Sequence, residues 1–217
     1  MRRYGKLAAA FGAAVLLLAG CGQKVPDRIE KSTLVINAKG NVTAYQVGEF
    51  DKAYYNLSEL EVMAKEEAAR FCGSVKKSGA VKVDKVSGTQ DDGRVVVQYS
   101  FDGADSYQDF MKGDETLFYG TVAEAIRQGY GGVTMYDAKD GTSALWTEAA
   151  GELGKHVVIY CPGGRAEGEE EETGLAIYCP YKAEYVSEGA VVQKDGSVEK
   201  IWTAENVSEP LYILLKK

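Results

Sequence analysis

The longest uncharged apolar run in the chain lies near its N-terminus, and it decides which residues are available to build a fold. It extends from residue 7 to residue 20, a length of 14 residues, and three positive side chains precede it: Arg2, Arg3 and Lys6. A positive segment followed by a short apolar run is the plan of a secretory signal peptide. A membrane-spanning helix needs about 20 apolar residues, so this run is too short to span a bilayer. We therefore expect residues 1–20 to be removed.

The residues that close this run are more specific than an ordinary cleavage site. Leu18, Ala19, Gly20 and Cys21 resemble the lipobox of bacterial lipoproteins, in which a branched apolar residue and two small residues precede a cysteine. The resemblance implies that the signal peptidase recognises Leu18, Ala19 and Gly20, and that Cys21 carries lipid with acyl chains such as palmitate. Two such chains make a stable membrane anchor, because each buried methylene contributes about 0.8 kcal/mol. The alternative is a plain signal peptide, or a short uncut anchor, with an incidental cysteine.

The chain that remains is acidic. Loss of the three N-terminal cations leaves 22 basic residues against 32 acidic ones, a net charge of −10. Such a surface repels nucleic acid and anionic headgroups, so no nucleic-acid partner is expected. Fourteen tyrosines favour a folded domain over a disordered stalk. The expected location is the extracytoplasmic face of the cell membrane, with residues 21–32 as a lipidated tether.

Residue patterns predict an α+β half over residues 33–130. Alternating apolar residues indicate strands at 33–37, 42–50, 81–86 and 94–101, of which the first two form a hairpin. A main helix is expected from Ser58, which has Glu61 at the spacing of a capping box, to Gly73. Its expected apolar face consists of Leu60, Met63, Ala64, Ala68 and Phe71. A second capped helix is expected from Thr121, with Glu124, to Gly129.

The half that follows, residues 131–217, lacks helical signals. Strands are expected near residues 133–136, 143–148, 155–161, 175–186, 190–193, 197–203 and 211–215. The dipeptides Asp140-Gly141 and Asp195-Gly196 indicate hairpin turns. The expected fold class is α+β, with antiparallel sheets packed on one main helix and a mostly β C-terminal half. Residues 129–132 are the expected seam, although the two halves could also form one compact unit.

Several short motifs resemble those of small lipoproteins from clostridial-type bacteria, which have no assigned activity. They are the first hairpin with its Lys-x-Gly turn, the Phe50-Asp51-Lys52 segment, the run from Gly120 to Ala125, and Tyr212-Ile213. The resemblance implies a Gram-positive origin. It implies no catalytic activity.

The sequence Ile-Tyr-Cys-Pro occurs twice, at residues 159–162 and 177–180. If the two copies pair as an antiparallel hairpin, Cys161 lies opposite Cys179, close enough for a disulfide. The extracytoplasmic environment permits disulfides. The alternative is that both cysteines are buried thiols that act as small hydrophobic residues.

Other candidate sites are isolated residues. Cys72 could be a nucleophile with His156, the sole histidine, as its base, or it could be a structural thiol. No serine-hydrolase elbow, phosphate loop or zinc motif occurs, so we expect no metal, cofactor or assigned catalytic residue. The acidic run at 169–172 fits a solvated loop better than a calcium site.

Aromatic residues offer a stacking surface for sugar, or else belong to the core. The candidates are Phe50 with Tyr54 and Tyr55, and the pair Trp146 and Trp202. Because the residues that a reaction needs are missing or isolated, the expected function is a non-catalytic binding module at the cell surface. Its expected partner is an envelope protein or a glycan. The alternative is a carboxylate-based hydrolase acting on cell-wall polymers or glycans, because carboxylate pairs assemble from distant positions.

Overall fold

The computed structural model describes residues 25–89, 93–112, 115–151, 154–163 and 173–217. The lipobox, with Cys21, and the acidic run at 169–172 lie outside the described residues. Within the described part of the chain, no helix is both long enough and apolar enough to cross a membrane.

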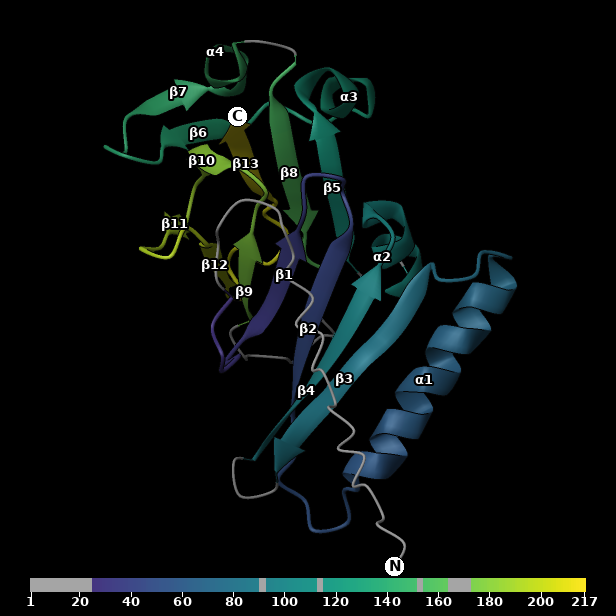
Figure 1. Cartoon of the computed structure of the whole chain (residues 1–217). Helices are drawn as coiled ribbons and strands as arrows, with labels where there is room; N and C mark the ends of the chain where they lie inside the picture. The colour runs from purple at the N-terminus through teal and green to yellow at the C-terminus, as the bar shows by residue number, and fades with distance from the viewer. Residues whose placement is uncertain (1–24, 90–92, 113–114, 152–153, 164–172) are drawn as a thin grey trace, which may run out of the picture.

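Two sheets contain the strands of the described residues (Figure 1). The first consists of β1 (Ser32–Ile36), β2 (Val42–Glu49), β3 (Val81–Thr89), β4 (Arg94–Phe101), β9 (Thr173–Tyr178), β11 (Ala190–Val192) and β12 (Val198–Trp202), in the spatial order β11-β12-β9-β1-β2-β4-β3. The second consists of β5 (Thr116–Thr121), β6 (Thr134–Asp137), β7 (Ser143–Leu145), β8 (His156–Cys161), β10 (Lys182–Ser187) and β13 (Leu211–Lys216), in the order β5-β8-β13-β10-β6-β7. The α+β fold class and the β-rich C-terminal half are confirmed.

Both halves of the chain contribute to both sheets. Strand β5 precedes the expected seam at 129–132 but joins the second sheet, where it pairs with β8. Strand β9 follows the seam but joins the first sheet, where it pairs with β1 in parallel, Thr33 opposite Ala176. The pairings between other adjacent strands are antiparallel. The ranges 33–130 and 131–217 are therefore interleaved in space.

Helix α1 (Leu57–Ser74) is the main helix, with 18 residues. It begins before the expected start, because the side chain of Asn56 accepts hydrogen bonds from the backbone N–H groups of Ser58 and Glu59. Asparagine is as good an N-cap as serine, so Asn56 caps the helix and the predicted Ser58–Glu61 box was wrong. Figure 1 shows α1 lying beside β3, the edge strand of the first sheet.

The buried face of α1 is narrower than the sequence pattern predicted. Ala64 and Ala68 are buried, and Leu60, Phe71 and Cys72 pack beside them. Met63 is 65% exposed, contrary to the prediction. Successive residues of an α-helix are about 100° apart around its axis. Met63 therefore lies roughly 100° around the axis from the centre of the buried face that Ala64 and Ala68 form.

The end of α1 also differs from the prediction. The left-handed position belongs to Lys76, with φ of 54°, and not to Gly73. The N–H of Lys77 donates to the Cys72 carbonyl (3.1 Å) and the N–H of Lys76 donates to the Gly73 carbonyl (3.3 Å). These two bonds make the motif in which glycine is usual at the left-handed residue. The left-handed residue therefore lies three positions after the predicted glycine, and the helix ends at Ser74.

The smaller elements follow local signals. Helix α3 (Val122–Arg127) has the predicted capping box of Thr121 and Glu124. Strand β4 alternates between buried and half-buried residues along its length, as predicted. The predicted strand at 143–148 was partly wrong, because helix α4 (Trp146–Ala150) begins after Leu145, whose N–H donates to the Glu148 carboxylate at 3.1 Å.

The repeated Ile-Tyr-Cys-Pro sequences end strands. The predicted strand at 175–186 is divided into β9 and β10, which belong to different sheets, with Pro180 between them. Proline has no N–H to donate to a ladder, so the chain leaves the first sheet there. Pro162 follows the end of β8 in the same way. The predicted hairpin of the two copies was wrong, because β8 pairs with β5 and β13, whereas β9 pairs with β1 and β12.

Two cores fill the space between these layers. The larger joins the inner faces of both sheets to α1 and α2 (Ala104–Phe110), and the smaller lies between the second sheet and helices α3 and α4. Aromatic residues join α1, α2 and β4: Phe71, Tyr99, Phe101, Tyr107 and Phe110. The inner face of the first sheet is thus covered partly by the second sheet and partly by α1 and α2.

Candidate functional site

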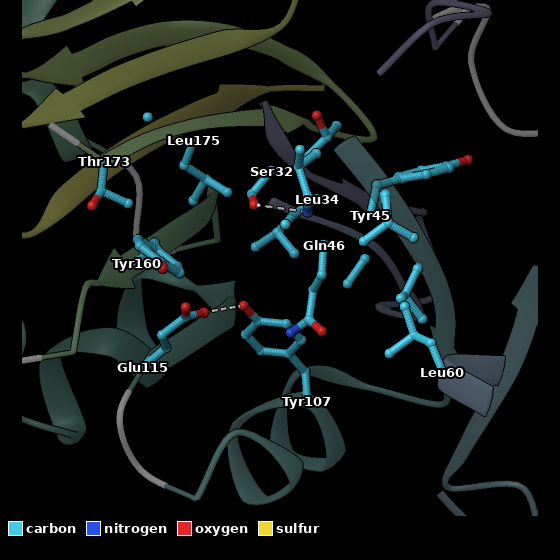
Figure 2. Close-up of a pocket in the computed structure, with 17 residues that line it drawn as sticks. Ser32, Leu34, Tyr45, Gln46, Leu60, Tyr107, Glu115, Tyr160, Thr173 and Leu175 are labelled. Atoms are coloured by element: carbon cyan, nitrogen blue, oxygen red, sulfur yellow. Dashed lines mark hydrogen bonds between the residues drawn. The ribbon is translucent and has the colours of Figure 1, made fainter. Parts of the chain in front are cut away.

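A groove of about 420 Å³ lies on the inner face of the first sheet, between the part covered by the second sheet and the part covered by α1 and α2. Its floor is formed by β1, β2, β4 and β9, and its walls come from Leu60 of α1, Tyr107 of α2 and Tyr160 of β8. Figure 2 shows this groove and the side chains that line it. It contains apolar walls with a few polar groups, which is the usual composition of a small-molecule site.

Strand alternation determines which floor residues face the groove. Leu34, Ala44, Val97 and Leu175 are buried and belong to the core that joins the two sheets. The intervening residues point to the opposite face of the sheet; Tyr45, for example, points away from the groove in Figure 2. The centre of the floor is therefore apolar, and Ser32, Gln46 and Thr173 lie on the same strand faces beside it.

The carboxylate of Glu115 is the centre of the polar part of the groove. Glu115 follows α2 and precedes β5, and its carboxylate accepts a short hydrogen bond from the Tyr107 hydroxyl (Figure 2). The Tyr160 side chain lines the groove on the same side as this carboxylate (Figure 2). Burial, and then the Glu115 charge, raise the pKa of both Tyr107 and Tyr160. Both hydroxyls therefore stay protonated, and that of Tyr107 donates to Glu115.

Two further residues shape the groove. The Gln46 side chain lies beside Tyr107 in Figure 2, and its Nε2 donates to Met111 Sδ at 3.2 Å. Gly48 lies at the exposed mouth, where a Cβ would meet only Val95 Cγ1 at 3.7 Å, an ordinary contact. A larger side chain at residue 48 would consequently enter the groove without displacing backbone.

The sequence did not single out Glu115, Tyr107 or Tyr160. Tyr160 belongs to the first Ile-Tyr-Cys-Pro copy, which attracted attention for its cysteine. Tyr107 lies on the short helix α2 and Glu115 on the connection that follows it, and they have no spacing typical of a motif. The site forms because β8 of the second sheet and helix α2 both pack on the inner face of the first sheet. A linear sequence pattern does not reveal this packing.

The structure does not bring Cys72 to His156 through any contact among the described residues. The Cys72 thiol donates to the Val81 carbonyl at 3.4 Å, as a structural thiol would. The His156 ring packs against Tyr119 (5.6 Å between ring centroids) and Tyr181 (5.8 Å). Burial, and then Lys217, lower the pKa of His156, while Glu124 opposes them.

Cys161 and Cys179 are free thiols, each at the end of a strand in a different sheet. The disulfide proposed between them is therefore not formed in this structure. Burial raises the pKa of Cys179 to about 12, which keeps this thiol protonated and unreactive. Cys179 belongs to the larger core, where it packs as a small hydrophobic residue.

The aromatic candidates separate into two groups. Phe50, Tyr54 and Tyr55 lie together, with Tyr55 stacked on Phe50 at 5.4 Å and Tyr54 78% exposed. They line a shallow pocket of about 390 Å³ at the start of α1. Trp146 and Trp202 are buried in the two cores, so they offer no stacking surface.

No group of three or more histidine, cysteine, aspartate or glutamate side chains in the described ranges is arranged to hold a metal ion. The groove around Glu115 is thus the best-formed candidate site, a half-open, largely apolar cavity with one partly buried hydrogen bond between Tyr107 and Glu115. Comparison of this chain with protein-family models, with curated proteins and with solved structures found no match.

Proposed function

We propose that the chain is a lipid-anchored extracytoplasmic binding module, held at the membrane by Cys21, whose ligand occupies the groove around Glu115. The groove is the observation that supports this proposal. Its carboxylate accepts a hydrogen bond from Tyr107 and the centre of its floor is apolar. Both properties suit the binding of a ligand and require no reaction. The proposed ligand is a glycan or an exposed segment of an envelope protein.

The hydrolase alternative has weaker support. Hydrolysis of a glycosidic bond uses two carboxyl groups, one with a raised pKa. Two acidic residues line each of three described pockets: Asp105 and Glu124, Glu67 and Asp109, and Glu49 and Glu59. In the first, the backbone N–H and hydroxyl of Thr121 donate to Glu124 and lower its pKa, which is the opposite of what a general acid needs. In the second, Glu67 forms an ion pair with Lys112 at 3.4 Å. The binding interpretation is therefore favoured.

Replacing Cys21 with serine is expected to abolish incorporation of radiolabelled palmitate into the protein and to release it from membranes. The reason is that the acyl chains would be attached through the Cys21 thiol. Labelling and fractionation of cells that express the full chain measure both effects. Cys72→Ser is the matched control and is expected to keep the label. Labelled Cys21→Ser protein would contradict the anchor.

Filling the groove is expected to abolish ligand binding without unfolding the protein. In Gly48→Leu the added side chain projects past Val95 into the mouth, where the backbone accepts a Cβ. The measurement is thermal unfolding of the full chain against glycans and cell-wall fragments. A ligand at a hundred times its dissociation constant stabilises by about 2.7 kcal/mol, which raises the midpoint by roughly 5–10 °C.

Val96→Leu is the matched control for this substitution, because Val96 points to the opposite face of the same sheet. It is expected to keep the ligand-dependent shift. If a ligand raises the unfolding midpoint of Gly48→Leu as much as that of the wild type, the groove is not the binding site. If no compound in the panel raises the midpoint of either protein, the module binds a different class of ligand.

A further inference from the structure

The charge of Glu115 is not balanced within the groove. Tyr107, its hydrogen-bond donor, is neutral, and none of the described residues that line the groove is a lysine or an arginine. No ion pair to Glu115 occurs among the described residues. A carboxylate has about four lone-pair positions, so the phenol donor Tyr107 leaves acceptor capacity for a ligand.

The surroundings increase the effect of this charge. Tyr107 and Tyr160 are almost fully buried, and the floor beside them is formed by Leu34, Ala44 and Leu175. A charge that is partly removed from water attracts an opposite charge more strongly than it would at the surface. The tyrosine rings also attract cations through their faces.

We infer that the groove binds a small organic cation, an ammonium or guanidinium group carried on an apolar body. The cationic group would lie at Glu115 between the two tyrosines, and the apolar body would lie on the floor toward Gly48 and Leu60. This inference rests on the proposed function, because it narrows the ligand of the binding module to one that presents such a group.

The test uses three compounds that share a phenylethyl body and differ in charge: phenethylammonium, phenethyl alcohol and hydrocinnamate. Each is titrated by calorimetry into the full chain held in lipid nanodiscs, with empty nanodiscs as the blank. Saturable binding is expected for the cation. The neutral compound is expected to bind at least about tenfold more weakly, and the anion is expected not to bind.

Two variants locate the charge that is responsible. Glu115→Gln keeps the shape and the acceptor for Tyr107 but removes the charge, and it is expected to reduce the affinity for phenethylammonium to that for the alcohol. Asp195→Asn is the matched control. Asp195 also accepts a hydrogen bond from a tyrosine, the Tyr178 of β9, at 2.7 Å. It is not among the residues that line the groove. It is expected to bind phenethylammonium as the wild type does.

The outcomes separate this inference from the proposed function. Equal binding of the cation and the alcohol, with loss of both in Gly48→Leu, would overturn the charge inference and leave the groove as a binding site. Undiminished binding of the cation by Glu115→Gln would also overturn it. Failure of all three compounds to bind the wild type would overturn the inference, and the glycan and wall-fragment series would then decide the proposed function by itself.

Discussion

Replacement of Trp202 by alanine is expected to lower the free energy of unfolding by about 3–5 kcal/mol, the usual range for a large buried aromatic residue. Trp202 is only 1% exposed and belongs to the larger core. Whole domains are stable by about 5–15 kcal/mol, so this one change removes a large part of the total. Thermal unfolding of the purified chain should show a midpoint lower by roughly 10 °C.

The size of the effect has three physical sources. Alanine leaves a cavity beside the Tyr160 ring, which lies 5.5 Å from the Trp202 ring. The Glu209 carbonyl loses the hydrogen bond that Trp202 Nε1 donates at 2.8 Å. The buried ammonium of Lys200, which lies 5.9 Å from the indole centroid, loses its cation–π contact.

Two controls distinguish these sources from general damage. Ile201→Ala changes the adjacent residue, which is half exposed, and should alter stability by less than about 1 kcal/mol. Trp146→Ala removes an indole of equal size from the smaller core, where Nε1 has no hydrogen-bond partner among the described residues. It should destabilise without disturbing Tyr160. A Trp202→Ala protein as stable as Ile201→Ala would contradict the packing described here.

Local signals predicted much of the fold, because each depends on a few neighbouring residues. The alternation of β4, the Thr121–Glu124 cap and the Asp140-Gly141 and Asp195-Gly196 hairpins are all present. Errors arose where two local signals competed. Asn56 and Ser58 are both good N-caps, and the chain uses Asn56. Lys76 adopts the left-handed conformation although Gly73 is nearby.

The order of the strands in the two sheets could not be predicted from these local signals. Nothing in the residues of β9 indicates that it pairs in parallel with β1 and not with β8. The two copies of Ile-Tyr-Cys-Pro have the same pattern, so the sequence favoured pairing them with each other. The pairing of β9 with β1 brings Thr173 and Leu175 to the groove, while β8 contributes Tyr160 from the other sheet. The candidate site is a product of this long-range topology, so its residues have no signature in the sequence.

The hairpin end that holds one rim of the groove provides the second large prediction. Gly88 of β3 has φ of +157° and pairs with Val95 of β4, which lines the groove. A Cβ at Gly88 would lie 2.4 Å from the Arg94 carbonyl oxygen and 2.8 Å from the Val95 Cα. Both contacts are with backbone, so no side-chain rotation relieves them, and the ladder between β3 and β4 must open.

Gly88→Ala is therefore expected to lower the free energy of unfolding by about 3 kcal/mol or more, since an unfavourable backbone conformation and an overpacked contact each cost about 1–3 kcal/mol. Gly93→Ala is the matched control, because Gly93 has φ of +63° but open space around a Cβ, so only the conformational cost of about 1–2 kcal/mol applies. Chemical denaturation measures both variants. Equal losses would show that the approach of β4 to Gly88 does not restrict residue 88. A larger loss in Gly88→Ala, together with weaker binding of phenethylammonium, would show that this hairpin end also holds Val95 in place at the rim of the groove.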